Sequence, residues 1–86
     1  MKLIITPHFQ KKVSQFPQSL KELIQIKLEL FFDNPKHPSL QSKKIQGTEG
    51  IFESRINSDI RFTWEYCEDS IVLRNIGHHD PTIKNP

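Results

Sequence analysis

Side chains able to move protons are concentrated in the second half of the chain. Glu53 supplies a carboxylate, and residues 77–80 contain two adjacent histidines and an aspartate. Carboxylate and imidazole groups act as general bases and acids because they can exchange protons with a substrate. Arg55 and Arg61 lie close to Glu53 in the sequence and add two fixed positive charges. The set indicates acid–base chemistry, provided that the fold brings these residues together.

The same histidine-rich segment raises the alternative of a metal site. His78, His79 and Asp80 are all residue types that bind metals, but adjacent residues rarely converge on one ion. No second cluster supports them, because His8 and His37 lie far away in the sequence. We therefore expect neither a metal nor a cofactor.

Alternation along two expected strands, residues 51–57 and 60–66, puts the charged side chains on one face. Successive side chains of a strand point to opposite faces. The polar set comprises Glu53, Arg55 and Asn57 from the first strand, and Arg61, Thr63 and Glu65 from the second. The same pattern also fits an ordinary solvated surface, with cross-strand ion pairs worth roughly a few tenths of a kcal/mol each.

Two helices are expected before these strands. Thr6 can cap a helix that begins with Pro7 and carries an apolar stripe up to Phe16. Residues 19–22 have the form of a capping box for a second helix, with apolar residues at helical spacing, which ends before Pro35.

The order of the elements predicts a single α+β domain over residues 1–86. A short strand at residues 2–6 precedes the helices, and strands 51–57, 60–66 and 71–76 follow with connections that suit antiparallel hairpins. Two N-terminal helices should pack on one face of a small, mostly antiparallel four-stranded sheet, in the order β-α-α-β-β-β. The other face should be free, residues 43–46 are a further candidate strand, and residues 77–86 should be irregular.

Composition bounds the class of protein. The chain has 86 residues, a net charge of +2 and one cysteine, so an internal disulfide is excluded and a reducing compartment fits. No apolar run approaches the roughly 20 residues that a membrane span requires. We expect a cytoplasmic protein that has no membrane partner.

Several segments together resemble the RelE/ParE superfamily of bacterial toxins. The resemblance covers nearly the whole chain and is strongest between residues 34 and 80. Its ordered segments are residues 34–40, 43–45, 50–55, 59–62 and 74–80.

The resemblance implies a toxin held inactive by a small antitoxin from the same operon. RelE-like members cut messenger RNA on the ribosome without a metal, by attack of a 2′-hydroxyl on the adjacent phosphate. This reaction needs a base, an acid and positive charge near the phosphate. The resemblance assigns Glu53 as base, Arg55 and Arg61 as charge stabilisers, and His79 as acid, while Glu53 and His79 can exchange roles.

A second group of residues is expected to contact RNA on the same resemblance. Arg74 has a structural alternative, pairing with an acid, and Asp80 can instead orient His79. The group comprises Lys43, Lys44, Arg74, His78, Asp80 and Lys84.

Two other functions stay open within the superfamily. ParE-like members inhibit DNA gyrase and have no nuclease activity, and an inactive member would bind only its antitoxin. The sequence departs from many RelE-like toxins, because residues 81–86 contain no late aromatic side chain and Glu53 and Arg55 replace a lysine pair.

Overall fold

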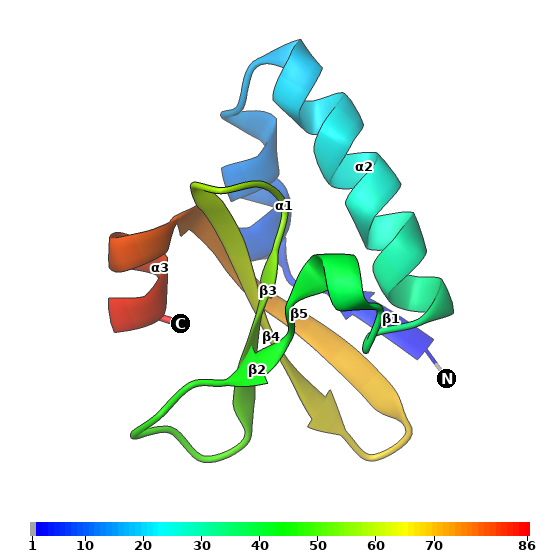
Figure 1. The fold of residues 1–86 in the computed structure, drawn as a ribbon, viewed down its shortest axis with the longest axis vertical. Helices are drawn as coiled ribbons and strands as arrows, with labels where there is room; N and C mark the ends of the chain where they lie inside the picture. Colours follow the sequence, from blue (N-terminus) through cyan, green and yellow to red (C-terminus); the bar gives the residue numbers. More distant parts are fainter. Residues whose placement is uncertain (1) are drawn as a thin grey trace.

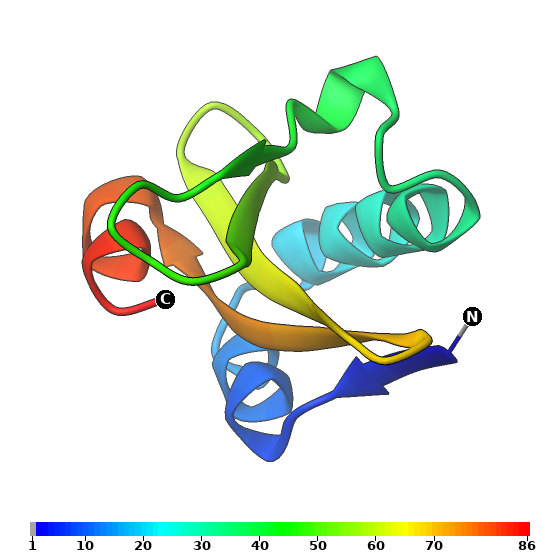
Figure 2. The same cartoon turned by 90° about the horizontal axis from the view of Figure 1, so that it is seen from below.

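The computed structural model describes residues 2–86, which form one twisted sheet with helices on both sides (Figures 1 and 2). The elements are β1 (Lys2–Ile5), α1 (Pro7–Ser14), α2 (Gln18–Asp33), the 3₁₀ turn η1 (Pro38–Leu40), β2 (Lys43–Lys44), β3 (Ile51–Arg55), β4 (Ile60–Cys67), β5 (Ser70–His78) and α3 (His79–Lys84).

The sheet has the strand order β1-β5-β4-β3-β2. β1 runs parallel to β5, and the other neighbours are antiparallel hairpin partners. The predicted α+β class is confirmed, but the sheet has five strands in place of four. The additional strand arises because Lys43 and Lys44 pair with Glu53 and Phe52 at the edge.

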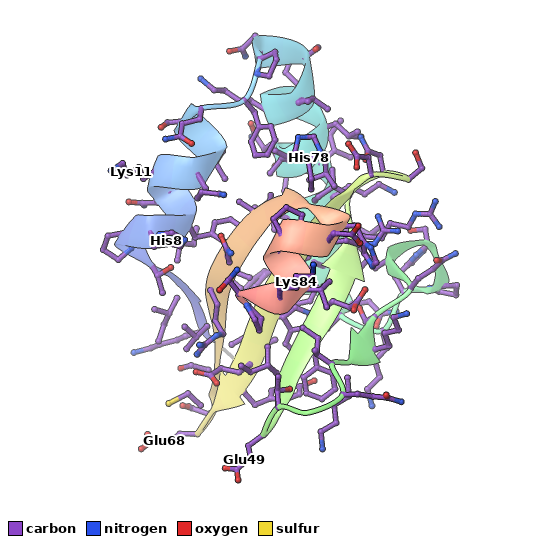
Figure 3. All side chains as sticks on the ribbon, turned by 90° about the vertical axis from the view of Figure 1, so that its left-hand side faces the viewer. His8, Lys11, Glu49, Glu68, His78 and Lys84 are labelled. Carbon is purple, nitrogen blue, oxygen red and sulfur yellow. The ribbon has the colours of Figure 1, made fainter. Side chains whose placement is uncertain are left out.

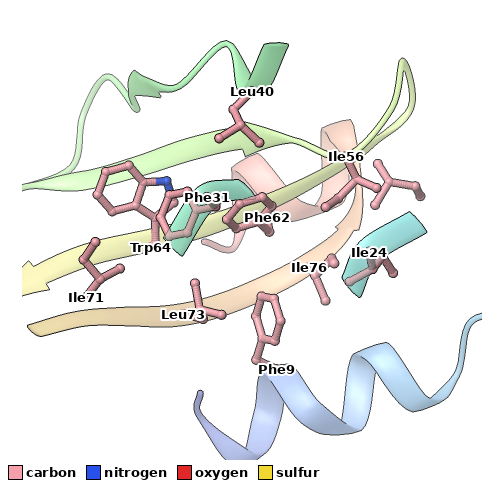
Figure 4. Close-up of a cluster of buried hydrophobic side chains, with 11 residues drawn as sticks. Phe9, Ile24, Phe31, Leu40, Ile56, Phe62, Trp64, Ile71, Leu73 and Ile76 are labelled. Carbon is pink, nitrogen blue, oxygen red and sulfur yellow. The ribbon is translucent and has the colours of Figure 1, made fainter. Parts of the chain in front are cut away.

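The core lies between the sheet and the two N-terminal helices (Figure 4). Phe31 of α2 contacts both Phe62 and Trp64 of β4, with ring centroids 5.1 and 5.0 Å apart. Phe9 of α1 packs edge-on against Phe62 at 6.4 Å. Such aromatic pairs bury large apolar areas and fix the orientation of the helices on the sheet.

Thr6 caps α1 as the sequence predicts. Its side chain accepts a hydrogen bond from the backbone N–H of Phe9, at 3.2 Å, and its hydroxyl donates to the carbonyl of Leu73 in β5. The cap therefore ties the start of α1 to the centre of the sheet. The second predicted cap is wrong, because α2 begins after Pro17 with no side-chain cap.

The prediction that residues 77–86 are irregular is wrong. β5 continues to His78, and α3 follows at once and lies on the opposite side of the sheet from α2 (Figure 1). Its six residues carry no apolar periodicity that a sequence pattern could reveal. Tertiary contacts hold it, since Thr82 is buried and the backbone N–H of His79 donates to the carbonyl of Asp59. The sheet face expected to be free is therefore partly covered.

Within residues 2–86, no helix combines the length and the apolar character needed to cross a membrane.

Candidate functional site

Strands β3 and β4 place the three predicted charged residues on one face of the sheet. Arg55 is the cross-strand partner of Arg61, and Glu53 is the partner of Thr63. Side chains of paired residues point to the same side of a sheet, and pairs two residues apart along the strands share that side. Glu53, Arg55 and Arg61 are therefore neighbours, as alternation predicts.

Glu53 lies at the centre of this group. Only 5% of the residue is exposed, and its Oε1 atom is 4.0 Å from Nε of Arg61 and 3.9 Å from Nε2 of His79. A buried carboxylate is costly unless charged or polar partners surround it. Arg61 and His79 are those partners, so one carboxylate joins β3, β4 and the start of α3.

Both arginines bind the same backbone carbonyl. The oxygen of Asn57 accepts from Nη1 of Arg61 at 2.6 Å and from Nε of Arg55 at 3.2 Å. Arg55 Nη1 also donates to the side-chain oxygen of Gln41, at 2.8 Å. The shared acceptor therefore holds the two guanidinium groups beside each other, an arrangement that suits binding of one anion by both.

The turn between β3 and β4 is fixed by Asn57 itself. Its side-chain oxygen accepts hydrogen bonds from the backbone N–H groups of Asp59 and Ile60, at 2.9 and 2.7 Å. An asparagine that binds the backbone two residues ahead stabilises a tight turn. The role of Asn57 in orienting the arginines is not visible in the sequence, because it depends on a main-chain atom.

His79 is the first residue of α3 and lies between two carboxylates. Its Nδ1 atom is 3.1 Å from Oδ1 of Asp80, and its Nε2 atom faces Glu53. The side chain is 45% exposed, whereas that of Glu53 is only 7% exposed. His79 is therefore the more solvent-accessible of the two acid–base groups of the site.

His78 and His79 point in different directions. His78 is the β5 partner of Ile60, so it lies on the other side of the strand from Arg61 and its partner Gly77. Its Nδ1 atom contacts Oδ2 of Asp59 at 2.6 Å. His78 therefore does not share the face of Arg61, since consecutive residues at a strand end alternate.

The other residues predicted to contact RNA do not all lie on the face that carries Glu53. Lys43 is the partner of Glu53 and shares its face, whereas Lys44 is the partner of Phe52 and lies on the other face. Arg74 forms an ion pair with Glu65, with Nη1 3.0 Å from Oε1, and also donates to the carbonyl of Pro86. Its structural alternative, pairing with an acid, is the one observed.

Asp80 and Lys84 are exposed on α3. Asp80 contacts His79, as described above, and Lys84 lies in the last turn of the helix (Figure 3). Within residues 2–86, no group of three or more His, Cys, Asp or Glu side chains is arranged to hold a metal ion.

The arrangement combines a buried carboxylate, two cations and a reachable imidazole. Guanidinium groups stabilise negative charge that develops on a phosphate, and the carboxylate and imidazole can take up and release protons. The site therefore contains the groups required for transfer or cleavage of a phosphate ester without a metal.

No family model matches the sequence, and no curated protein matches it. Solved structures do match. A YoeB/ParE toxin from Agrobacterium tumefaciens has a TM-score of 0.76 and 16% identity, over 92% of this chain and 99% of that one. YafQ from E. coli has a TM-score of 0.77 and 13% identity, over 93% and 94% of the two chains.

A third match comes from the RelB–RelE antitoxin–toxin complex of Methanococcus jannaschii. Its TM-score is 0.72 at 21% identity, over 87% of this chain and 88% of that one. In all three cases the likeness extends over nearly the full length of both chains, while the identity is low. The chain therefore has the fold of the RelE, YoeB and YafQ toxins.

Proposed function

We propose that the chain is the toxin of a toxin–antitoxin pair and cleaves messenger RNA on the ribosome without a metal. The observation that carries the proposal is the meeting of Glu53, Arg55, Arg61 and His79 on one sheet face, within a fold shared with RelE, YoeB and YafQ. A fold alone does not establish an activity, so the site carries the weight.

In the proposed reaction, the 2′-hydroxyl of one nucleotide attacks the phosphorus that follows it. Glu53 takes the hydroxyl proton, the bond between phosphorus and the 5′-oxygen breaks, and His79 gives a proton to that oxygen. The products are a 2′,3′-cyclic phosphate and a 5′-hydroxyl. Glu53 gains one proton and His79 loses one. Both groups return to their starting protonation states when a proton passes from Glu53 to His79.

Arg55 and Arg61 supply the charge stabilisation. The phosphorane carries more negative charge than the diester, so donors already fixed in position lower the barrier. Their common acceptor, the carbonyl of Asn57, holds both guanidinium groups before the substrate arrives. Binding then requires little rearrangement of either side chain.

Substrate binding must change the contact between Glu53 and His79. Their nearest atoms are 3.9 Å apart in the free protein, whereas an in-line reaction needs a base and an acid on opposite sides of phosphorus. His79 is the group that can move, because its side chain is 45% exposed. With the roles exchanged, His79 would be the base and Glu53 the acid, and the products would be the same.

The proposed partner is a small antitoxin protein. Support comes from the RelE match, which is an antitoxin–toxin complex, and from an apolar groove of about 480 Å³ between β1 and α2. Ile5 and Phe32 line this groove and are 41% and 53% exposed. An exposed apolar surface of this kind suits an apolar segment of a partner.

Induction of the gene, followed by mapping of RNA ends, tests the proposed function. We expect new 5′-hydroxyl ends inside translated codons, and suppression of these ends when the neighbouring antitoxin gene is co-expressed. Intact transcripts accompanied by DNA-damage signalling would instead indicate a ParE-like action on gyrase. Intact transcripts without growth arrest would indicate an inactive member that binds only its antitoxin.

A further inference from the structure

A groove with polar and apolar walls lies outside the candidate nuclease site. It has a volume of about 750 Å³ and is bounded by α1, the end of β5, α3 and the turn between β3 and β4. His8 on α1 and His78 at the end of β5 mark two of its sides (Figure 3). The proposed cleavage reaction uses none of its polar side chains.

The floor of this groove is built around Gly77. A Cβ atom at this position would lie 2.7 Å from Oγ1 of Thr82 and 3.4 Å from Nζ of Lys12. Only glycine therefore fits at this point, where an ammonium group from α1 and a hydroxyl group from α3 both lie close to the backbone of β5. Any larger residue would clash with the hydroxyl of Thr82.

Thr82 is buried without a hydrogen-bond partner. The residue is 1% exposed, and its Oγ1 atom forms no hydrogen bond within residues 2–86. An unsatisfied buried hydroxyl destabilises a protein, so such groups are rare and call for an explanation. A ligand in the groove would provide the missing hydrogen bond.

Lys12 supplies positive charge at the same point. No carboxylate of the described residues lies within 4.0 Å of its ammonium group, so its charge is available to a ligand. The one carboxylate lining the groove belongs to Asp59, which contacts His78 at 2.6 Å. Asp59 is thus engaged by His78 and does not pair with Lys12.

The polar wall beside Lys12 is preorganised. The side-chain nitrogen of Asn75 donates to the carbonyl of Asn85, so the side-chain oxygen of Asn75 is the acceptor for Nε2 of His8, at 3.1 Å. This contact places the hydrogen of the His8 ring on Nε2. Phe16 and Leu20 form an apolar wall that suits a base or a sugar.

We propose that this groove is a second binding site, which takes a nucleotide phosphate between Lys12 and the hydroxyl of Thr82. A phosphate oxygen accepts hydrogen bonds from both groups, and an ammonium group is a common phosphate ligand. The phosphate belongs either to a free nucleotide or to an RNA strand. The inference goes beyond the proposed nuclease and stands even if the chain cleaves no RNA.

Titration of the purified protein with adenosine 5′-monophosphate, observed by NMR, tests the site. We expect the backbone amides of Lys12, Gly77 and Thr82 to shift together and saturate. Lys12→Ala should weaken binding about 10- to 100-fold, as expected for loss of one charge-assisted hydrogen bond. Lys11→Ala is the matched control, because Lys11 is exposed on the same helix and does not line the groove, and it should change affinity less than about twofold.

Thr82→Val provides a second, independent test. Valine has the shape of threonine without the hydroxyl, so the variant should bind the phosphate more weakly and yet unfold at a higher temperature. Opposite effects on binding and stability are not expected if Thr82 has only a structural role.

A parallel titration with a short single-stranded RNA carrying 2′-O-methyl groups identifies the source of the phosphate. Tighter binding of the RNA, with the same three amides shifted, would assign the groove to an RNA strand, and tighter binding of the mononucleotide would assign it to a free nucleotide. Absence of shifts at the three amides, or equal effects of Lys12→Ala and Lys11→Ala, would overturn the proposal.

Discussion

Replacement of Arg61 by alanine separates its structural role from its proposed chemical role. Arg61 Nε lies 4.0 Å from the carboxylate of Glu53, and their side chains are 15% and 7% exposed. At an effective dielectric constant of about 20, the attraction at this distance is about 4 kcal/mol, much of which offsets desolvation of the two ions. Removal of one partner of a buried pair usually costs about 3–5 kcal/mol. Because Glu53 keeps His79 at 3.9 Å, we expect a loss near the lower end, about 3 kcal/mol.

This loss does not unfold the protein. A domain with a free energy of unfolding of about 5 kcal/mol, the low end of the usual range, would retain about 2 kcal/mol, which leaves about 3% of the molecules unfolded. Loss of folded protein would therefore lower activity by only a few per cent. Loss of a donor that stabilises the transition state lowers the rate about 10²- to 10³-fold. A large decrease in activity would therefore report chemistry.

The assay combines urea denaturation with single-turnover cleavage of ribosome-bound messenger RNA. Cleavage is measured without urea, at a temperature where the variant is fully folded. We expect Arg61→Ala to cleave about 10²- to 10³-fold more slowly than the wild type. Arg61→Lys keeps the charge and loses the planar fork, so its loss should be smaller. Added guanidinium ion should partly restore Arg61→Ala. A folded Arg61→Ala variant that cleaves at the wild-type rate would remove Arg61 from the mechanism.

Three further substitutions test other contacts. His79→Gln should slow cleavage about 10²- to 10⁴-fold with unchanged stability. An RNA with sulfur in place of the leaving 5′-oxygen needs no acid, because the thiolate departs without a proton. This RNA should restore cleavage by His79→Gln and not by Glu53→Gln. If this RNA restores cleavage by Glu53→Gln alone, Glu53 is the acid and His79 is the base. Ser54→Ala should lower the free energy of unfolding, measured in urea, by about 1–3 kcal/mol, because the buried indole N–H of Trp64 loses its acceptor 2.8 Å away. An unchanged urea midpoint would contradict this prediction. Gly77→Ala should lower it by about 1–3 kcal/mol, and a double variant with Thr82→Ala should recover part of the loss; strictly additive losses would disprove the predicted clash.

Much of the site follows from the sequence because strand alternation is a strong constraint. The hairpin of β3 and β4 has a short turn, so its register is fixed and the face of each residue is determined. Glu53, Arg55 and Arg61 could thus be grouped before any coordinates. Their distances to His79 could not, because His79 belongs to a helix whose position depends on tertiary contacts.

The irregular pattern of β5 has a local cause. The register shifts between Thr63 and Trp64 of β4, whose partners in β5 are Asn75 and Leu73, so Arg74 is an extra residue in the ladder. A bulge of this kind reverses the alternation, which lets Leu73 and Ile76 both face the core. The sequence shows mixed alternation there, but it does not reveal which residue is inserted.

The division between Lys43 and Lys44 shows a similar limit. Their alternation is evident once β2 is known to be a strand, yet a two-residue edge strand has no periodicity of its own. The contact of both arginines with the carbonyl of Asn57 is also beyond sequence patterns, because every residue has a carbonyl. Contacts that depend on backbone atoms or on short elements need coordinates.

The most direct test of the central claim is the chemistry of the cut made by purified protein that has been treated with EDTA and then separated from the chelator. With ribosome-bound messenger RNA, we predict fragments that end in a 2′,3′-cyclic phosphate and begin with a 5′-hydroxyl, and no cut where the attacking 2′-hydroxyl is replaced by hydrogen. Cleavage that persists at the 2′-deoxy position, or that is lost after the EDTA treatment and returns only when a transition metal is added back to the protein, would contradict a metal-independent attack by the RNA itself.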